Sequence, residues 1–182
     1  MISKHINHFL LIALFLISLK ISAQKVPSTT GSNVSQQDAQ EALDFHNKVR
    51  KDVGTPALEW STELAAYAQA WADHLANDEN CNMKHRPRDG GKWNQIHGEN
   101  IFWGSASSYN ALSASESWYS EIKDYKHEVL NSTNWYAAGH YTQMVWRNTT
   151  KVGIAQATCP SGAILIVGNY DPPGNYMGEK AY

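Results

Sequence analysis

Apolar residues recur at helical spacing in three segments of the first two thirds of the chain. The first helix is expected to begin at Ser35-Gln36-Gln37-Asp38, which has the spacing of a capping box, and to end near Asp52. Ser61 is expected to cap the second helix, a third is predicted over residues 111–125, and residues 81–98 are expected to be irregular. The apolar faces carry Ala42, Phe45, His46 and Val49, then Leu64, Ala68, Trp71 and Leu75, and then Leu112, Ser115, Trp118, Ile122 and Tyr125.

The last third of the chain changes to short runs of β-branched and aromatic residues. Strands are predicted over residues 141–147, 152–158 and 163–170, separated by turns at Asn148-Thr149-Thr150 and Pro160-Ser161-Gly162. This pattern indicates an antiparallel meander. Because the helices come first and the strands later, an α+β layered domain is favoured over a repeat of βαβ units.

The first 23 residues have the order of a secretory signal peptide. Lys4 stands near the start, the apolar run Phe9 to Ile17 follows, and small residues end at Ala23. The run is too short for a permanent membrane-spanning helix, so no transmembrane anchor is expected. Residues 24–37, rich in Ser, Thr and Asn, are predicted to be a flexible lead-in to a single domain over residues 38–182. The protein is therefore expected to be secreted, soluble and extracellular.

Charge and composition exclude some functions. Without Lys4 and Lys20, which lie in the predicted signal peptide, thirteen basic residues stand against seventeen acidic ones, a formal charge of −4. This balance argues against nucleic acid as a partner and against binding to an anionic membrane surface. Seven Trp and nine Tyr are consistent with a dense core, and alternatively some of them line an apolar ligand groove.

Cys81 and Cys159 are the two cysteines of the chain. In an oxidising compartment an even pair most simply forms one disulfide. It would close a loop of roughly 80 residues, for which the chain-entropy relation gives about 4 kcal/mol of stabilisation. It would also tether the segment of His85 to the predicted C-terminal hairpin.

Several familiar enzyme motifs are incomplete in the sequence. His127-Glu128-Val129-Leu130-Asn131 starts like a zinc-protease helix but lacks the second His, and Gly90-Gly91-Lys92-Trp93 lacks the spacing of a phosphate loop. The sequence has no Gly-x-Ser-x-Gly elbow. Among the other histidines, His46 is expected to be a hydrogen-bonded structural residue, whereas His74 and His127 are expected to be solvated.

Two imidazoles and two carboxylates stand in four separate segments. His85 follows Cys81, Glu99 follows His97-Gly98, Glu121 follows Trp118, and His140 lies in the run Gly139 to Trp146. Taken from the residues alone, they form either a metal site, a catalytic site or a buried polar network.

Five motifs follow one another along the chain: Cys81-Asn82-Met83-Lys84-His85, His97-Gly98-Glu99-Asn100-Ile101, Trp118-Tyr119-Ser120-Glu121, Gly139 to Trp146, and Gly168-Asn169-Tyr170-Asp171-Pro172-Pro173-Gly174-Asn175-Tyr176. In this order they resemble the signature of the CAP superfamily. That family comprises cysteine-rich secretory proteins, antigen-five proteins and plant pathogenesis-related group-one proteins. The resemblance spans about residues 38–182 and is strongest to the plant group.

The resemblance implies an α-β-α sandwich around a small antiparallel sheet, the CAP or SCP domain. It maps a cleft tetrad onto His85, Glu99, Glu121 and His140. It also implies weak binding of zinc or another divalent cation, mainly through the two histidines, whose coordination leaves positions open for water or an exogenous ligand. The carboxylates would then ligate the cation, accept hydrogen bonds from its water, or orient the imidazoles.

The chain departs from the plant group in its cysteines. Plant members usually have six, and three of the positions are occupied here by Ala138, Ile154 and Gly168. This indicates a divergent or bacterial branch of the family.

Three functions are consistent with the resemblance. The first and favoured one is a non-enzymatic module that binds a sterol, fatty acid or other lipid, or an extracellular protein partner. The second is a metal-dependent hydrolase or protease with Glu99 or Glu121 as general base on a bound water. The third is a purely structural tetrad in a protein that acts through another surface.

Overall fold

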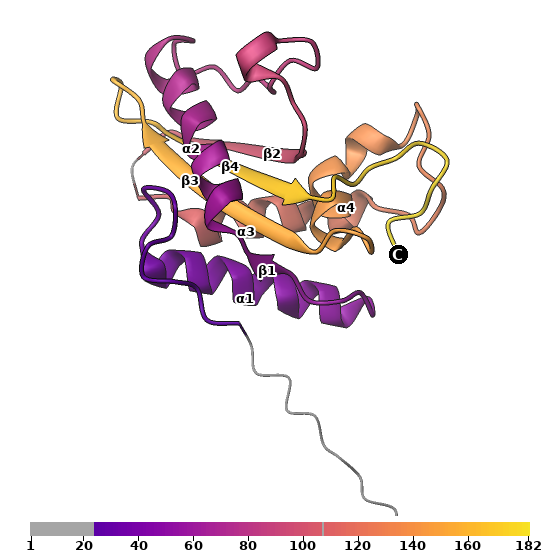
Figure 1. The fold of residues 1–182 in the computed structure, drawn as a ribbon. Helices are drawn as coiled ribbons and strands as arrows, with labels where there is room; N and C mark the ends of the chain where they lie inside the picture. Colours follow the sequence, from indigo (N-terminus) through magenta and orange to yellow (C-terminus); the bar gives the residue numbers. More distant parts are fainter. Residues whose placement is uncertain (1–23, 107) are drawn as a thin grey trace, which may run out of the picture.

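A four-stranded sheet between two layers of helices forms the fold in the computed structural model, which describes residues 24–106 and 108–182 (Figure 1). The strands lie in the order β1-β3-β4-β2. The central strand β4 is antiparallel to both of its neighbours, and the short β1 joins β3 in parallel. Their bounds are β1 Glu59–Trp60, β2 Gly98–Gly104, β3 Lys151–Thr158 and β4 Ile164–Asp171. The predicted signal peptide lies outside the described residues.

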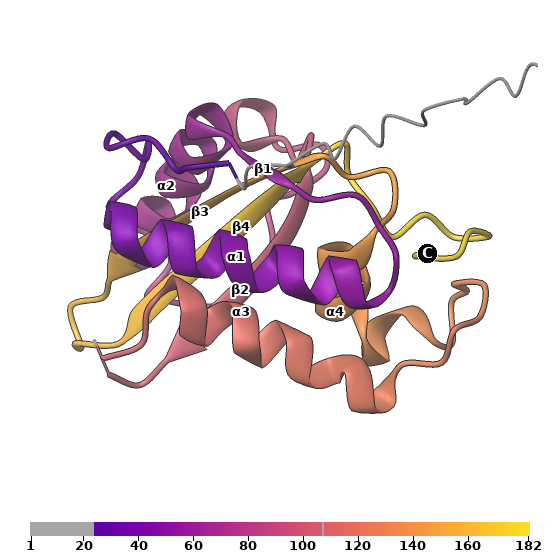
Figure 2. The same cartoon turned by 90° about the horizontal axis from the view of Figure 1, so that it is seen from below.

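The helices cover both faces of the sheet. One layer is α2, which lies across β3 and β4, and the other contains α1 and α3 side by side (Figure 2). The α-helices are α1 Gln36–Asp52, α2 Thr62–Asn77, α3 Ala111–Tyr119 and α4 Gly139–Val145, and the 3-10 turns are η1 Gly91–Trp93, η2 Ser120–Asp124 and η3 Trp135–Ala137. The α+β class and the α-β-α arrangement are therefore confirmed.

Local sequence signals mark the starts of the helices correctly, whereas the third helix ends earlier than the predicted residue 125. The Ser35 hydroxyl accepts a hydrogen bond from the Asp38 amide at 3.1 Å, and the Ser61 hydroxyl accepts one from the Leu64 amide at 3.2 Å. The third helix begins at Ala111 as predicted. It is α-helical to Tyr119 and then tightens into the 3-10 turn η2.

Two hydrophobic cores lie on opposite faces of the sheet. The larger one, beside α1, α3 and α4, includes the fully buried Trp118 and Trp146. The smaller one, beneath α2, contains Trp71 and is closed by the disulfide between Cys81 and Cys159, which confirms that pairing. The tryptophans in these cores support the prediction of a dense aromatic interior.

Gly153 lets α2 approach β3 closely. A Cβ atom at this position would stand 2.1 Å from the backbone nitrogen of Ala65, well inside contact distance. The absence of a side chain at this point of β3 therefore sets the distance between the helix and the sheet.

The segment predicted as a strand over residues 141–147 is the helix α4, so that prediction is wrong. Its residues prefer strands locally, but distant side chains satisfy both helix ends. The Glu121 carboxylate accepts the first amides, and the Arg50 guanidinium donates to the carbonyls of Met144 and Trp146, each at 2.9 Å. Tertiary contacts thus outweigh a weak β preference.

The sheet is completed by β2, a strand that the sequence did not predict. Its residues pair with β4 over its whole length, with Asn100 opposite Gly168. The strands predicted over 152–158 and 163–170 are confirmed as β3 and β4. Because β2 comes from before α3, the antiparallel part of the sheet is not a simple meander.

Of residues 24–37, which we expected to be a flexible lead-in, residues 24–35 lie against the domain and the last two begin α1. Val26 is fully buried and donates its amide to the Gln40 side chain at 2.8 Å. The Trp60 indole donates to the Thr30 carbonyl at 2.9 Å. Short polar residues here form bends, and these contacts fix the segment against α1 and β1.

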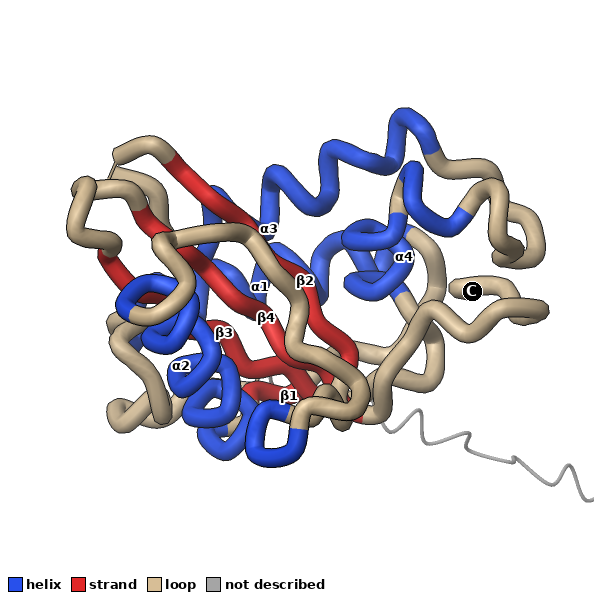
Figure 3. Tube along the Cα trace, turned by 90° about the horizontal axis from the view of Figure 1, so that it is seen from above, coloured by secondary structure: helices blue, strands red, loops and turns tan. Residues whose placement is uncertain are grey.

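The C-terminal segment runs beside the loop that precedes α4 (Figure 3). The Leu130 amide donates to the Glu179 carbonyl at 2.9 Å, and the Gly178 amide donates to the Leu130 carbonyl at 2.8 Å. Of the helices in the described ranges, none combines the length and apolar character required to cross a membrane.

Candidate functional site

His85 and Glu99 form the first of the two histidine–carboxylate pairs among the four predicted site residues. His85 lies in the segment that the disulfide anchors after α2, and Glu99 is the second residue of β2. The Nδ1 atom of His85 is 2.8 Å from Oε1 of Glu99, which also accepts the Arg86 amide at 3.1 Å. The Glu99 side chain is fully buried, whereas that of His85 is 56% exposed. The imidazole ring therefore lies at the surface, and its Nδ1 atom is paired with a buried carboxylate.

His140 and Glu121 form the second pair. Glu121 lies on η2 and His140 is the second residue of α4. The Nδ1 atom of His140 is 2.6 Å from Oε1 of Glu121, and Oε2 of the same carboxylate accepts the amides of His140 at 2.8 Å and Tyr141 at 3.2 Å. The Trp118 ring stacks on the imidazole with ring centroids 6.4 Å apart.

Asn100 on β2 connects the two pairs. It follows Glu99 directly, and its side-chain amide donates to the His140 carbonyl at 3.0 Å. The structure thus brings all four predicted residues to one region, as two separate pairs. Within the ranges 24–106 and 108–182, no three His, Cys, Asp or Glu side chains gather closely enough to hold a metal ion on their own.

Two buried arginines support the site, and neither was predicted to do so. Arg50 of α1 donates to four carbonyls, including that of Thr149 at 2.8 Å, and thereby fixes the end of α4. Burial lowers its pKa to about 10. Arg86 lies behind Glu99, and burial likewise lowers the pKa of its guanidinium. The sequence offers no signal for Arg86 beyond its position directly after His85.

The remaining histidines are partly as expected. His46 is fully buried, with Nδ1 2.8 Å from the Ala42 carbonyl and Nε2 2.9 Å from the Tyr170 hydroxyl, which confirms its structural role. His127 is exposed, as predicted. The prediction for His74 is wrong, because its ring stacks on Trp93 with centroids 4.5 Å apart and its side chain is only 16% exposed.

The donor chemistry of the two pairs is compatible with a divalent cation held by the histidines. A carboxylate that accepts the Nδ1–H of an imidazole leaves the Nε2 lone pair for a ligand, which is the usual arrangement around metal-bound histidine. His85 and His140 would be the ligands. Glu99 and Glu121 would orient them, since their oxygens already accept hydrogen bonds or face Arg86.

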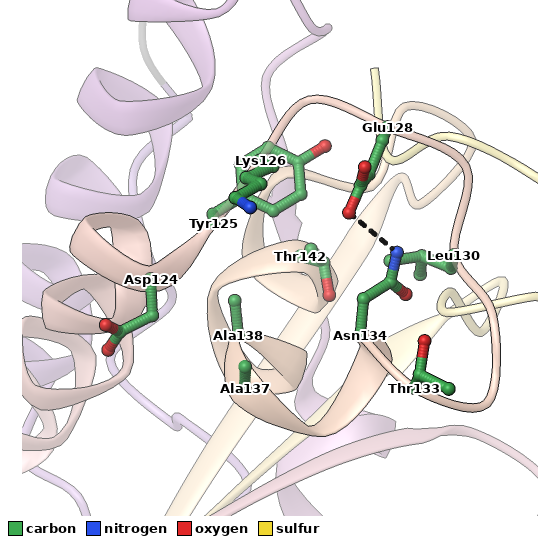
Figure 4. A pocket seen from close by; sticks show the side chains of 10 residues that line it. All are labelled: Asp124, Tyr125, Lys126, Glu128, Leu130, Thr133, Asn134, Ala137, Ala138 and Thr142. Atoms are coloured by element: carbon green, nitrogen blue, oxygen red, sulfur yellow. Dashed lines mark hydrogen bonds between the residues drawn. The ribbon is translucent and has the colours of Figure 1, made fainter.

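A separate pocket lies between η2 and α4 (Figure 4). Its volume is about 170 Å³, below the range typical of ligand pockets. The charged and amide groups of Lys126, Glu128 and Asn134 line it, and the last two are hydrogen-bonded at 3.1 Å. This pocket is too small to enclose a sterol, so lipid binding stays a prediction.

Comparisons with known proteins agree with the fold and the motifs. The family model described as "Cysteine-rich secretory protein family" matches residues 43–170, and the chain belongs to this CAP family. Pathogenesis-related protein 1A of Nicotiana tabacum is 40% identical over 174 residues, which cover 96% of this chain and 94% of the relative. Pathogenesis-related protein 1 of Arabidopsis thaliana is 38% identical over 148 residues, which cover 81% of this chain and 84% of the relative.

Solved structures give the same result. The crystal structure of NaASP2 with Zn2+ aligns with a TM-score of 0.70 and 26% identity, over 82% of this chain and 86% of that chain. The crystal structure of Na-ASP-1 aligns with a TM-score of 0.71 and 28% identity, over 88% of this chain and 44% of that chain.

Proposed function

We propose that this CAP protein is a secreted, non-enzymatic binding module that takes up a divalent cation, most simply zinc, through Nε2 of His85 and of His140. The observation that carries the proposal is that two imidazoles each direct Nδ1 to a carboxylate at 2.8 Å or less in pairs that Asn100 links. Water or a group from a partner would complete the coordination, since zinc prefers four ligands. A CAP relative with 26% identity has been crystallised with zinc.

The carboxylates suit an orienting role better than a catalytic one. Glu99 is buried and faces Arg86, so it has no exposed oxygen for a water molecule. Both oxygens of Glu121 accept N–H groups from the start of α4. A general base needs an oxygen within reach of the proton that it removes. This arrangement supports binding over the alternative of a metal-dependent hydrolase or protease.

Competition for zinc against a chromophoric chelator tests the proposal. We expect the His85→Ala/His140→Ala double variant to lose zinc binding, and each single variant to bind more weakly than the wild type. The His127→Ala variant is the matched control, because His127 is an exposed histidine outside the two pairs. Affinity should fall below about pH 6, where imidazolium no longer ligates. Equal affinities of the wild type and the double variant would refute the proposal.

Secretion is part of the same proposal. The disulfide between Cys81 and Cys159 is typical of an oxidising compartment, and the first 23 residues have the order of a signal peptide. Expression of the full chain should yield a protein in the medium that begins near Gln24. N-terminal sequencing of the exported protein checks this, and retention of Met1 would contradict it.

Lipid binding is a second candidate function, supported by exposed apolar side chains. Val129, Trp135 and Tyr136 are exposed on the loop before α4, and Tyr176 and Met177 are exposed on the C-terminal segment beside it. Clusters of exposed apolar groups favour contact with a lipid or a protein partner. Extraction of a sterol or fatty acid by the purified protein tests this function, with the Trp135→Ser/Tyr136→Ser variant expected to extract less. Equal extraction by the variant would count against it.

A further inference from the structure

Arg86 and Glu99 face each other in the interior behind His85. The whole Arg86 residue is 3% exposed and the Glu99 side chain is fully buried. The Nε atom of Arg86 lies 3.8 Å from Oε2 of Glu99, and within the described part of the chain neither atom has a hydrogen-bond partner. Each buried atom is therefore compensated mainly by the opposite charge on the other side chain.

Aromatic side chains fix the position of the Arg86 guanidinium. Its central carbon is 3.7 Å from the centroid of the Tyr67 ring and 5.2 Å and 5.4 Å from the rings of Trp71 and Trp93. The Nη2 atom also donates a hydrogen bond to the Tyr67 carbonyl. Cation–π contacts and this hydrogen bond hold the charge beneath the site and away from solvent.

A buried carboxylate is costly unless a cation or several donors compensate it. The Arg86 charge holds the Glu99 carboxylate beside His85. Its Oε1 atom accepts the Nδ1–H of His85 and the backbone N–H of Arg86. The proton of the imidazole is thereby fixed on Nδ1. The free lone pair of His85 is then on Nε2, in a side chain that is 56% exposed.

We propose that Arg86 is a positioning residue, whose buried charge holds Glu99 where it fixes the Nδ1–H tautomer of His85 for a divalent cation. The last part of this inference rests on the proposed function. The second pair has a different support, because Glu121 accepts two backbone amides in addition to the imidazole of His140. His140 thus serves as an internal control for changes at Arg86.

Zinc competition with Arg86 variants tests the binding part. Arg86→Gln removes the charge and keeps a planar donor, and we expect about a tenfold loss of affinity, the lower end of the effect of removing an outer partner of a ligand. Arg86→Lys keeps the charge and should recover most of that loss. Arg88→Gln, at an exposed arginine two residues away, should bind like the wild type. Wild-type affinity in Arg86→Gln would overturn the proposal.

A double-mutant cycle separates positioning from a general structural effect. If Arg86 acts through Glu99, the Arg86→Gln change should have no further effect in a Glu99→Gln background. A tenfold loss in both backgrounds would overturn the proposed route. The cycle uses circular dichroism at each step to compare only folded variants.

Nitrogen-15 NMR of the imidazoles in zinc-free protein tests the positioning part by itself. We expect the Nδ1–H tautomer for His85 in the wild type, a mixture of tautomers in Arg86→Gln, and the Nδ1–H tautomer for His140 in both. An Nε2–H tautomer for wild-type His85 would overturn the inference even if no Arg86 variant folds. Failure of wild-type zinc binding with the expected tautomers would instead refute the proposed function and leave the positioning role supported.

Discussion

The fully buried His46 is expected to make the stability of the fold depend on pH above the range in which carboxylates titrate. Its Nδ1–H donates to the Ala42 carbonyl, so Nε2 accepts from the Tyr170 hydroxyl. A second ring proton would remove the Nε2 lone pair that accepts this hydrogen bond. Burial lowers the pKa of His46 from 6.5 to about 4.

The sign and size of the effect follow from proton linkage. Between pH 6.5 and 4 the unfolded chain binds a proton at His46 that the folded chain excludes, so the free energy of unfolding falls as the pH falls. With these two pKa values, about 2 kcal/mol is lost between pH 7 and pH 5. The loss saturates below the folded-state pKa.

Urea unfolding at pH 7, 6 and 5 and constant ionic strength, followed by tryptophan fluorescence, measures this loss. The His46→Gln variant cannot titrate, so its free energy of unfolding should change by about 2 kcal/mol less than that of the wild type over the same range. Only the difference in slope is compared, since the substitution itself lowers stability at every pH. Parallel curves for the two proteins would refute the reasoning.

Three further changes should lower the free energy of unfolding in the same urea assay at pH 7. Arg50→Lys should lose about 3 kcal/mol, because a single ammonium cannot serve four carbonyls in the geometry of a guanidinium. Gly153→Ala should lose about 3 kcal/mol, because the added methyl group overlaps the backbone of α2 at Ala65. Cys81→Ser/Cys159→Ser should lose about 4 kcal/mol, because the linked positions are 78 apart in the sequence.

Control substitutions of the same kind test whether these losses of stability have the stated causes or follow from any substitution. Lys51→Arg alters the exposed neighbour of Arg50 and should leave stability within about 0.5 kcal/mol. Gly139→Ala should also be tolerated by the fold, since a Cβ there meets nothing closer than 3.8 Å. Losses at Arg50 or Gly153 no larger than those of the matched changes would contradict the structural explanation. An unchanged free energy of unfolding in the double serine variant would contradict the explanation for the disulfide.

Local patterns in the sequence were sufficient for α1, α2, β3 and β4. Their signals lie within each segment: a capping hydroxyl at Ser35 or Ser61 followed by a helical period, or an apolar run between turns. The disulfide followed from the number of cysteines and the expected compartment. These features need no knowledge of what the segment packs against.

The segment that became α4 shows why the other features could not be predicted in this way. Its tyrosine, threonine, valine and tryptophan favour a strand, but Arg50 and Glu121 complete both ends of a short helix from positions far along the chain. The strand β2 was missed because polar residues occupy buried positions in it. It contains Glu99 and Asn100, polar residues whose burial depends on partners in other elements.

The four residues of the candidate site were singled out by their chemistry, and the family resemblance mapped them onto one cleft. The structure adds how they are arranged: two pairs, with each carboxylate accepting the Nδ1–H of its histidine. It also adds Arg86, whose burial against Tyr67 no local pattern indicates. The role of Arg86 depends on contacts between three different segments of the chain. No local sequence pattern predicts such contacts.

The unequal cores on the two faces of the sheet have a consequence for hydrogen exchange. Six of the twelve buried residues in the core beneath α2 are alanines, and the disulfide closes it, whereas the opposite core is larger and holds five buried Trp and Tyr side chains. After reduction, the amides of α2 should therefore exchange through local opening at a lower free energy than those of α1. Such opening would release Tyr67 and with it Arg86 and His85, while Glu121 and His140 stay fixed. The thiol–disulfide state of one bond would then control half of the candidate site.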